Sequence, residues 1–550
     1  MTGVDRLLYG GTLLDGRGGE PLDVDLGIRD GRVVAIAPWG QIPRAQAADA
    51  LDCRGLTVCP GFLDTHSHSD LKVLIEPDLP MKVSQGITLE VLGQDGVSVA
   101  PQSAARRPQM ARTIAGLDGT YEGWDWTDVG GYLDAVRAAR PGVHVAYLVP
   151  HGNIRLDAVG PDDRPATPHE LAAMVRALEE GLDQGAIGLS TGLIYPPCCY
   201  ASTDEMIALG RVLARYDRPI VVHMRSESDY ILEALDEMVE VGRQSGCRVH
   251  ISHFKIAGRR NWGLIDGVLS RFDAAAREGI RLSADQYPYT AGSTMMGAIL
   301  PPWCHAGGVE RTLSLLSDPD SRARIRDAML DPDPQPWDNF WSWAGAEGVF
   351  VADVASGRRP ELVGRSLADI GASLGQDPVL AALDLLRDEA MGVSMIAFSQ
   401  SEDVIAALMA HPLVNGCTDG LLLGKPHPRC YGAFPRILRL NREKNILPLP
   451  KLIQKLTRQG AEALTLPSRG VIALDAVADI VAFDADKVMD MATYQSPRQR
   501  CVGLPHVLVA GEPVMRDGEP TGGRPGGVVS TCAARRRTRT GAPARGARGR

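Results

Sequence analysis

Eight short apolar segments, separated by stretches with helical periodicity, constrain the fold of this chain more than any other feature. In chain order they are GFLDTHSH, ITLEVLG, VHVAYLVP, AIGLSTGL, PIVVHMRSE, VHISHFK, IRLSADQYPY and VNGCTDG. Intervening stretches such as TPHELAAMVRALEEGLDQG and STDEMIALGRVLARYD predict amphipathic helices with N-caps at Thr167 and Ser202. Eight strand-then-helix units predict an α/β protein with a (β/α)8 TIM-like barrel over residues 61–469. A further apolar run, VSMIAFSQ, precedes the eighth segment, so that strand has two candidates.

The two ends of the chain have a different sequence pattern from the predicted barrel. Residues 1–60 and 470–528 contain short apolar runs separated by glycine-rich turns, as in RLLYGGTLLDG and VLVAGEPVMRDG. This pattern is typical of short β-strands joined by tight turns. Since chain termini often lie close together, we expect the two segments to form one small β-sandwich domain.

Two further segments interrupt this organisation. Residues at about 291–350 are rich in proline and hold four of the eight tryptophans. An insertion here would follow the seventh strand and lie over the barrel mouth as a partial lid, or it would only pack on the barrel. Residues 529–550 are rich in arginine and contain no acidic residue, which predicts a disordered tail.

Histidines and aspartates follow several of the predicted strands. His66 and His68 alternate along one strand and therefore point to the same side. In a barrel of this type the carboxyl ends of the strands converge, so ligands from different strands can meet there. For each residue alone, packing or a turn is the better explanation. Together they predict a site for one or two divalent metal ions, with zinc the first choice. The set is His66, His68, Asp95, His223, His253 and Asp419.

Composition argues against several classes of partner. The net charge of −9 and an aromatic content of 5% are unfavourable for binding nucleic acid or a membrane surface. The sequence contains no run of about 20 apolar residues and no pattern of a signal peptide at its start. The ten cysteines lack CxxC spacing, so we expect reduced thiols and a cytoplasmic protein that acts on a small molecule. The sequence does not predict an oligomeric state.

The motifs resemble those of the amidohydrolase superfamily and, within it, of the N-acyl-D-amino-acid deacylases (D-aminoacylases). The resemblance covers residues 5–528 and rests on GFLDTHSHSD, GAIGLSTGLIYPP, HMRSE, SHFKIAG, DQYPYTAGST, and HPR with YGAFPR. It implies a metal-dependent enzyme that hydrolyses the linear amide of N-acyl-D-amino acids. It also implies that Lys255, Tyr287 and Ser293 contact the substrate, and that Tyr195 lines a pocket wall.

One residue departs from the family pattern in the predicted metal site. Asp95 stands where these deacylases usually have a cysteine ligand. A carboxylate is a harder ligand than a thiolate and has two oxygens, so a binuclear site or a divalent metal other than zinc becomes more plausible. The segment AIGLSTGL contains no lysine, so a carbamylated lysine bridge is not expected.

The predicted mechanism assigns Asp419 as the general base that takes a proton from water and returns it to the leaving amine. His151 could donate a hydrogen bond to the oxyanion, and Arg429 could bind the substrate carboxylate through two bonds. The alternative for Arg429 is a structural salt bridge. Other activities on the same fold are hydrolysis of a cyclic amide, as in dihydroorotase or hydantoinase, and dipeptidase activity. A non-catalytic scaffold is a more remote alternative.

Overall fold

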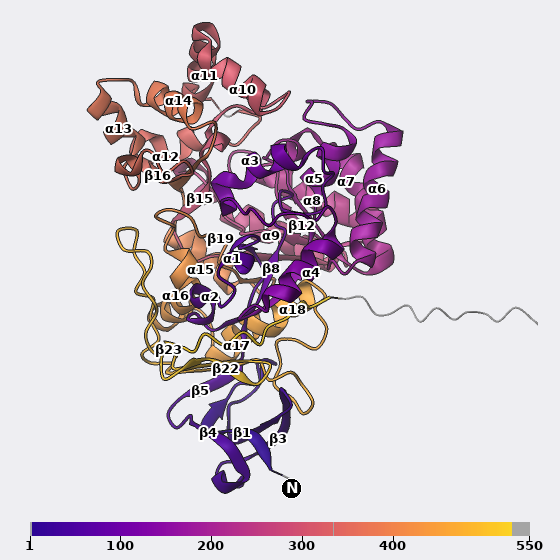
Figure 1. The fold of residues 1–550 in the computed structure, drawn as a ribbon, viewed down its shortest axis with the longest axis vertical. Coiled ribbons are helices and arrows are strands. Elements are labelled where there is room, and N and C mark those ends of the chain that lie inside the picture. Colours follow the sequence, from indigo (N-terminus) through magenta and orange to yellow (C-terminus); the bar gives the residue numbers. More distant parts are fainter. Residues whose placement is uncertain (1–2, 334, 531–550) are drawn as a thin grey trace, which may run out of the picture.

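Parallel strands form the centre of the fold (Figure 1). The computed structural model describes residues 3–333 and 335–530. One parallel sheet has the order β6-β8-β9, and another has the order β10-β11-β12-β13-β14-β18. The short strand β7 (Ser67–His68) pairs in parallel with β19 (Gly420–Leu421), which brings the first and last of these units together. The topology is therefore of the TIM-barrel type. The strand bounds are β6 Phe62–Asp64, β8 Ile87–Leu92, β9 His144–Tyr147, β10 Val149–Pro150, β11 Leu189–Gly192, β12 Pro219–His223, β13 Arg248–Ile251, β14 Leu282–Gln286 and β18 Val414–Gly416.

The order of the strands decides which apolar run is the eighth. Strand β14 pairs in parallel with β18, which lies in the segment VNGCTDG. The run VSMIAFSQ instead forms β17 (Val393–Phe398), which is antiparallel to β15 (Ala291–Met295) and β16 (Val349–Val354). All eight predicted apolar segments thus contain a parallel strand. Central strands such as β12 are buried along their whole length, as expected for a parallel sheet covered on both faces.

Helices connect the parallel strands. The helix α6 (Pro168–Asp183) begins with the predicted N-cap: Thr167 accepts from the Glu170 amide, and Glu170 in turn bonds the Thr167 backbone. Ser202 likewise caps α7 (Thr203–Tyr216). These caps satisfy amide groups that have no partner within the helix. The other helices of this part are α1 Lys72–Ile75, α2 Pro80–Val83, α3 Arg107–Asp118, α4 Val129–Ala139, α5 His151–Ala158, α8 Ile231–Ser245, α9 Ile265–Arg277, α15 Glu402–Ala410, α16 Arg429–Lys444, α17 Leu449–Gln454 and α18 Gly460–Ala463.

Strands from the two ends of the chain share one sheet. The antiparallel pairing of β20 (Ile480–Phe483) with β5 (Thr57–Pro60) joins the C-terminal strands to the N-terminal ones. In Figure 1 the indigo and yellow strands lie together at one end of the molecule. The remaining strands of this sheet are β1 Val4–Leu13, β2 Leu22–Arg29, β3 Arg32–Pro38, β4 Ala47–Asp52, β21 His506–Val509, β22 Glu512–Arg516 and β23 Glu519–Pro520. The predicted tail at 529–550 lies almost entirely outside the described residues.

A separate lobe is inserted between β14 and β18 (Figure 1). In the part of the chain that the structure describes, it consists of the antiparallel sheet β15-β17-β16 and five α-helices around a hydrophobic core that extends from Met296 to Ala397. The expected range of 291–350 therefore covers only the first part of the lobe. The prediction was too short because β17 resembles a barrel strand in sequence and pairs with neither barrel sheet. The helices are α10 Val309–Ser317, α11 Pro319–Leu330, α12 Phe340–Gly348, α13 Leu367–Leu374 and α14 Pro378–Asp388.

No helix among residues 3–333 and 335–530 has both the length and the apolar character needed to cross a membrane.

Candidate metal centre

The predicted metal ligands lie at or just beyond the carboxyl ends of parallel strands. His223 is the last residue of β12, and His253 lies two residues beyond β13. His66 follows β6, and Asp419 lies between β18 and β19. Because these strand ends open toward the same face of the fold, residues far apart in sequence come together there. The structure buries all six residues, and Asp95, at 8%, is the most exposed of them.

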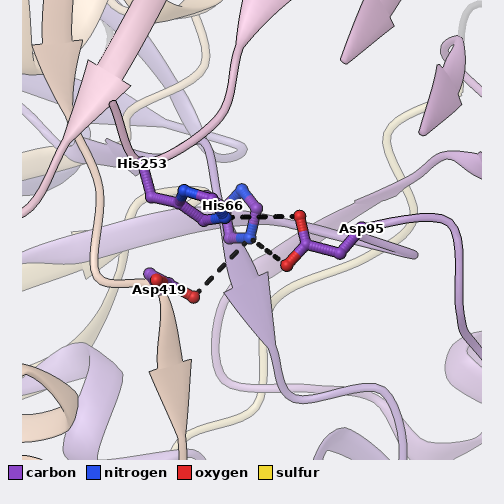
Figure 2. A group of neighbouring side chains, drawn as sticks. All are labelled: His66, Asp95, His253 and Asp419. Atoms are coloured by element: carbon purple, nitrogen blue, oxygen red, sulfur yellow. Dashed lines mark ion pairs between the residues drawn. The ribbon is translucent and has the colours of Figure 1, made fainter. Parts of the chain in front are cut away.

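Four of these side chains point toward one another (Figure 2). The His66 Nε2 atom lies 3.6 Å from Asp95 Oδ2 and 3.7 Å from Asp419 Oδ1. On the other side of Asp95, Oδ1 lies 3.4 Å from His253 Nε2. One ligand atom from each of the four residues lies within 4.8 Å of all the others. Two imidazoles and two carboxylates therefore surround a common point.

The two remaining histidines extend this group. His68 Nε2 lies 3.4 Å from Asp95 Oδ2 and 3.3 Å from Asp419 Oδ1. His223 Nδ1 lies 3.0 Å from His253 Nε2. Zinc–ligand bonds of about 2.0–2.2 Å in a tetrahedral arrangement place neighbouring ligand atoms roughly 3.3–3.6 Å apart. Four of the six separations fall within this range, the other two being 3.7 Å and 3.0 Å. The nitrogen and oxygen donors match the ligands that zinc binds.

The backbone is strained at three of the six positions. Asp95, His253 and Asp419 have positive φ angles of 53°, 34° and 48°. Residues other than glycine rarely adopt this region, and each instance costs on the order of 1–3 kcal/mol. Such strain persists where the surrounding structure requires a particular side-chain direction. The Asp419 amide also donates a 2.8 Å hydrogen bond to the His66 carbonyl, which fixes the two loops to each other.

The charges of the site favour a cation at its centre. Burial lowers the pKa of His68, but Asp419 and Asp95 outweigh burial and raise this pKa to about 10. The pKa of His253 is raised to about 9, because the same two carboxylates and Glu227 overcome burial and the charge of Lys255. For His223, burial dominates and lowers the pKa to about 3, so this imidazole is neutral and suited to bind a metal.

Glu227 belongs to the site although the sequence analysis did not single it out. Its Oε2 atom lies 3.2 Å from His223 Nε2, and its Oε1 atom lies 3.2 Å from His253 Nδ1. Lys255 Nζ donates to both Glu227 oxygens at 2.7 Å. The carboxylate thus contacts the ring nitrogens that face away from the common point, as carboxylates behind metal-binding histidines do. The only sequence signal was its position four residues after His223 in HMRSE.

Arg429 lies against Asp419 and is completely buried. Its Nη1 atom is 2.8 Å from Asp419 Oδ2, and its Nη2 atom donates to the Ser293 carbonyl at 2.9 Å. Burial raises the pKa of Asp419, but the Arg429 guanidinium and His253 hold it well below its usual range. These contacts agree with the alternative role of Arg429, a structural salt bridge. The geometry gives no support to the expected contact of Arg429 with the carboxylate of the substrate.

His151 is also completely buried, at the start of α5. Its Nδ1 atom lies 2.9 Å from Thr191 Oγ1, and its Nε2 atom lies 2.8 Å from Glu205 Oε1. Both ring nitrogens therefore have partners within the protein. The structure does not bring His151 to the cavity at the metal centre, so its expected hydrogen bond to an oxyanion has no geometric support.

A cavity opens directly onto the predicted ligands. Its wall includes the four residues that the family resemblance assigned to the substrate: Lys255, Tyr287, Ser293 and Tyr195. The Tyr287 hydroxyl accepts a 2.8 Å hydrogen bond from Gln400, so its own proton remains able to donate. Burial raises the pKa of Tyr287 to about 12, which keeps the phenol protonated.

A second, larger chamber adjoins this cavity between the barrel loops and the inserted lobe. Its volume is about 330 Å³, and the two spaces share Val97, Tyr195, Met295 and Phe340 as wall residues. Most of its other wall residues are apolar, for example Met110, Leu156, Leu193, Leu300, Trp337 and Met391. The arrangement offers room for a sizeable apolar group next to the metal centre.

Fold and site together define a TIM-barrel protein with a buried group of imidazoles and carboxylates at its strand ends, an arrangement typical of hydrolases that use divalent metals. The model of the amidohydrolase family matches residues 49–515. The chain belongs to the amidohydrolase family.

Relatives resemble the chain over nearly its full length. It is 35% identical over 528 residues to N-acyl-D-glutamate deacylase of Alcaligenes xylosoxydans xylosoxydans, covering 96% of both chains. It is 34% identical over 542 residues to D-aminoacylase of the same organism, covering 96% of this chain and 98% of the relative. The crystal structure of N-acyl-D-glutamate deacylase from Bordetella bronchiseptica, with zinc and a phosphonate mimic of the tetrahedral intermediate, is 34% identical. It has a TM-score of 0.81 over 96% of this chain and 100% of that chain. A D-aminoacylase structure concerned with a binuclear metal centre is 31% identical, with a TM-score of 0.80 and the same coverage.

Proposed function

We propose that the chain is a metal-dependent hydrolase that cleaves the linear amide bond of N-acyl-D-amino acids into a carboxylate and a free D-amino acid. The observation that carries this proposal is the convergence of four histidines and two aspartates in a chain similar to deacylases over 96% of its length. The D configuration rests on this similarity. The small-molecule substrate and a cytoplasmic location are part of the same proposal.

The metal would be held by His66, His68, Asp95, His223, His253 and Asp419. Asp95 would offer one oxygen to each part of the site, because Oδ1 faces His253 while Oδ2 faces His66 and His68. The buried Asp95 Oδ1 atom has no hydrogen-bond partner among the described residues, so this oxygen has an electron pair available for a cation. When bound, a divalent ion such as zinc supplies Lewis acidity, which polarises a carbonyl oxygen and makes water more acidic.

Asp419 is the proposed proton carrier. Its Oδ1 atom faces His66 and His68, and its Oδ2 atom is held by Arg429. The low pKa keeps the side chain in the ionised form, which is the form that a general base requires. The Asp419 carboxyl group then returns this proton to the nitrogen of the departing amine. Arg429 would orient the carboxylate during both steps.

Lys255 and Tyr287 are the proposed donors to the reacting carbonyl or to the carboxylate of the substrate. Lys255 is charged, because Glu227 and other neighbours raise its pKa despite burial. The Tyr287 hydroxyl and Ser293 line the same cavity, and donors fixed in advance stabilise developing negative charge at little cost. Tyr195, at the junction with the larger chamber, would guide the apolar part of the substrate.

We further propose a division of the chain into a (β/α)8 barrel and a small β-sandwich built from both ends. The parallel sheets β6-β8-β9 and β10-β11-β12-β13-β14-β18, together with the parallel pair β7–β19, support the first unit at about 61–469. The shared sheet of the N-terminal and C-terminal strands supports the second, at about 1–60 and 470–528.

A substrate panel tests the proposed function. The purified protein is assayed with N-acetyl-D-leucine, N-acetyl-D-glutamate, their L enantiomers, a hydantoin, dihydroorotate and a D,D-dipeptide. Each substrate is assayed with zinc, with manganese and with no added metal. We expect metal-dependent release of a free amino group from the N-acetyl-D compounds only. Turnover restricted to the cyclic amides or to the dipeptide would replace the proposal with one of the alternative activities. No metal-dependent turnover of any substrate would favour the non-catalytic scaffold.

A further inference from the structure

A carboxylate of the inserted lobe, that of Asp338, contacts the loop that carries Glu227. Asp338 Oδ1 accepts hydrogen bonds from Ser226 Oγ at 2.6 Å and from Ser228 Oγ at 2.7 Å. Asp338 Oδ2 accepts from the backbone amide of Glu227 at 2.7 Å. Asp338 is 4% exposed. One carboxylate of the lobe therefore accepts three hydrogen bonds from three consecutive residues of the barrel loop.

The residue at the centre of this loop reaches the metal centre. The Glu227 carboxylate contacts His223 Nε2, His253 Nδ1 and Lys255 Nζ. The Glu227 carbonyl accepts a further hydrogen bond from the Ala257 amide at 2.7 Å. The backbone of Glu227 is thus held on one side by the lobe and on the other by the loop after β13. Its side chain orients two imidazoles of the proposed metal site.

The segment that bears Asp338 also supplies part of the cavity wall. Asn339 caps α12 by accepting from the amides of Trp341 and Ser342. Phe340 and Trp343, on the first turn of that helix, line the cavity at the metal centre. The contact with the barrel loop and the placement of these two aromatic side chains therefore depend on the same few residues.

We propose that Asp338 is a positioning residue for the metal centre: by holding the Glu227 backbone it fixes the orientation of His223 and His253, so that docking of the inserted lobe completes the site. The relevance of this inference to catalysis rests on the proposed function. The inference itself concerns Asp338 and Glu227, which are not among the six proposed metal ligands. Loss of a group behind metal-binding histidines typically lowers metal affinity or activity about 10–100-fold, and we expect Asp338→Asn to fall in this range.

The first test uses the full-length metal-free protein. Hydrogen–deuterium exchange is followed for the peptide containing residues 226–228 in wild type, Asp338→Asn and the control Asp333→Asn. Asp333 is an exposed acid on the same segment. We expect faster exchange in Asp338→Asn, because one of the two accepting oxygens is replaced by an amide nitrogen that cannot accept a hydrogen bond, and no change in the control. Unchanged exchange in Asp338→Asn would overturn the proposal.

The second test measures whether the effect passes through Glu227. Zinc affinity is measured by competition with a chromophoric chelator for Asp338→Asn, Glu227→Gln and the double variant. We expect each single variant to bind zinc about 10–100-fold more weakly, and the double variant to be little worse than Glu227→Gln alone. Additive losses would show that the two residues act independently and would overturn the proposal. Ser226→Ala with Ser228→Ala, which removes two of the three hydrogen bonds and leaves Asp338 intact, should give a smaller loss.

Kinetics separate positioning from a purely structural role. On any substrate that the panel identifies, Asp338→Asn should lower kcat with little change in KM, and Asp338→Glu, which restores a carboxylate, should recover part of kcat. An unchanged kcat would contradict the proposal. The exchange and affinity measurements need no substrate, so failure of the proposed function would leave them interpretable.

Discussion

The Arg429 guanidinium lies 2.8 Å from Asp419, and the two residues are 0% and 5% exposed. Arg429 follows the HP of KPHPRCYG at the start of α16, and Asp419 lies at the carboxyl end of the barrel strand β18. The buried Arg429 guanidinium thus holds the Oδ2 atom of the carboxylate that is proposed to carry the proton. The Oδ1 atom of the same carboxylate faces His66 and His68.

Replacement of Asp419 tests the proposed proton carrier. Asp419→Asn keeps the size of the side chain but cannot accept a proton, so turnover should fall by about 10²–10⁴-fold. Metal content should stay close to that of wild type, because the remaining five predicted ligands are unchanged. Steady-state kinetics and elemental analysis of the same preparation check both statements. Normal hydrolysis of the best substrate by Asp419→Asn would exclude the assignment.

Replacement of Arg429 distinguishes a partner of Asp419 from a substrate anchor. Arg429→Met removes the charge that keeps the Asp419 pKa low, so the acid limb of the kcat–pH profile should move to higher pH, where Asp419 becomes ionised again. Breaking a buried ion pair should also lower the free energy of unfolding by about 3–5 kcal/mol. Lys444→Met, on the exposed end of the same helix, is the control. A large rise in KM with an unshifted profile would instead support a contact with the substrate carboxylate.

Variants at Asp95 test its role in binding one ion or two. Asp95→Ala should retain less metal after dialysis, because both oxygens that face the imidazoles are lost. Asp95→Cys, which restores the usual ligand of the deacylase family, should hold one zinc ion tightly and a second more weakly, since a thiolate is the softer ligand. Elemental analysis per protein chain gives the answer. A metal count that Asp95→Ala leaves unaltered would remove Asp95 from the site.

His151 should contribute to stability in a pH-dependent way although it lies outside the cavity. Burial lowers its pKa, but Cys198 and Glu205 outweigh burial and raise it to about 9. The contribution is therefore fully present below the ordinary value of about 6.5 and is lost as the pH rises through about 9. The difference amounts to roughly 3 kcal/mol at most.

The measurement compares wild type with His151→Gln by chemical denaturation of the metal-free protein between pH 6 and pH 9.5. Because all other titrating groups are common to both proteins, the destabilisation caused by the variant should shrink as the pH rises. A destabilisation that stays constant over this range would show that the His151 proton does not contribute.

The sequence brought together the residues proposed for the metal centre because its signals are local. Alternation along a strand places His66 and His68 on one side, and the convergence of parallel strand ends brings in His223, His253 and Asp419. Glu227 was not predicted, because it lies on an irregular loop where no periodicity shows which way a side chain points. For the same reason KPHPRCYG did not reveal whether Arg429 faces the cavity or Asp419.

The extent of the inserted lobe was less predictable for a different reason. The segment that forms β17 is apolar and about as long as the barrel strands, and only its pairing partners distinguish it from them. Pairing partners depend on tertiary contacts. Likewise, the contact of Asp338 with residues 226–228 joins segments more than 100 residues apart, and no sequence pattern marks it.

The positive φ angles at Asp95, His253 and Asp419 restrict how this centre can be redesigned. Residues branched at Cβ fit that backbone poorly, whereas asparagine, aspartate, histidine and glycine tolerate it best. In a mutant library designed to change the metal preference, many variants at these three positions would therefore fold poorly. This would hold even for side chains that are good metal ligands. His66, His68 and His223 carry no such penalty and are the better starting points for directed evolution.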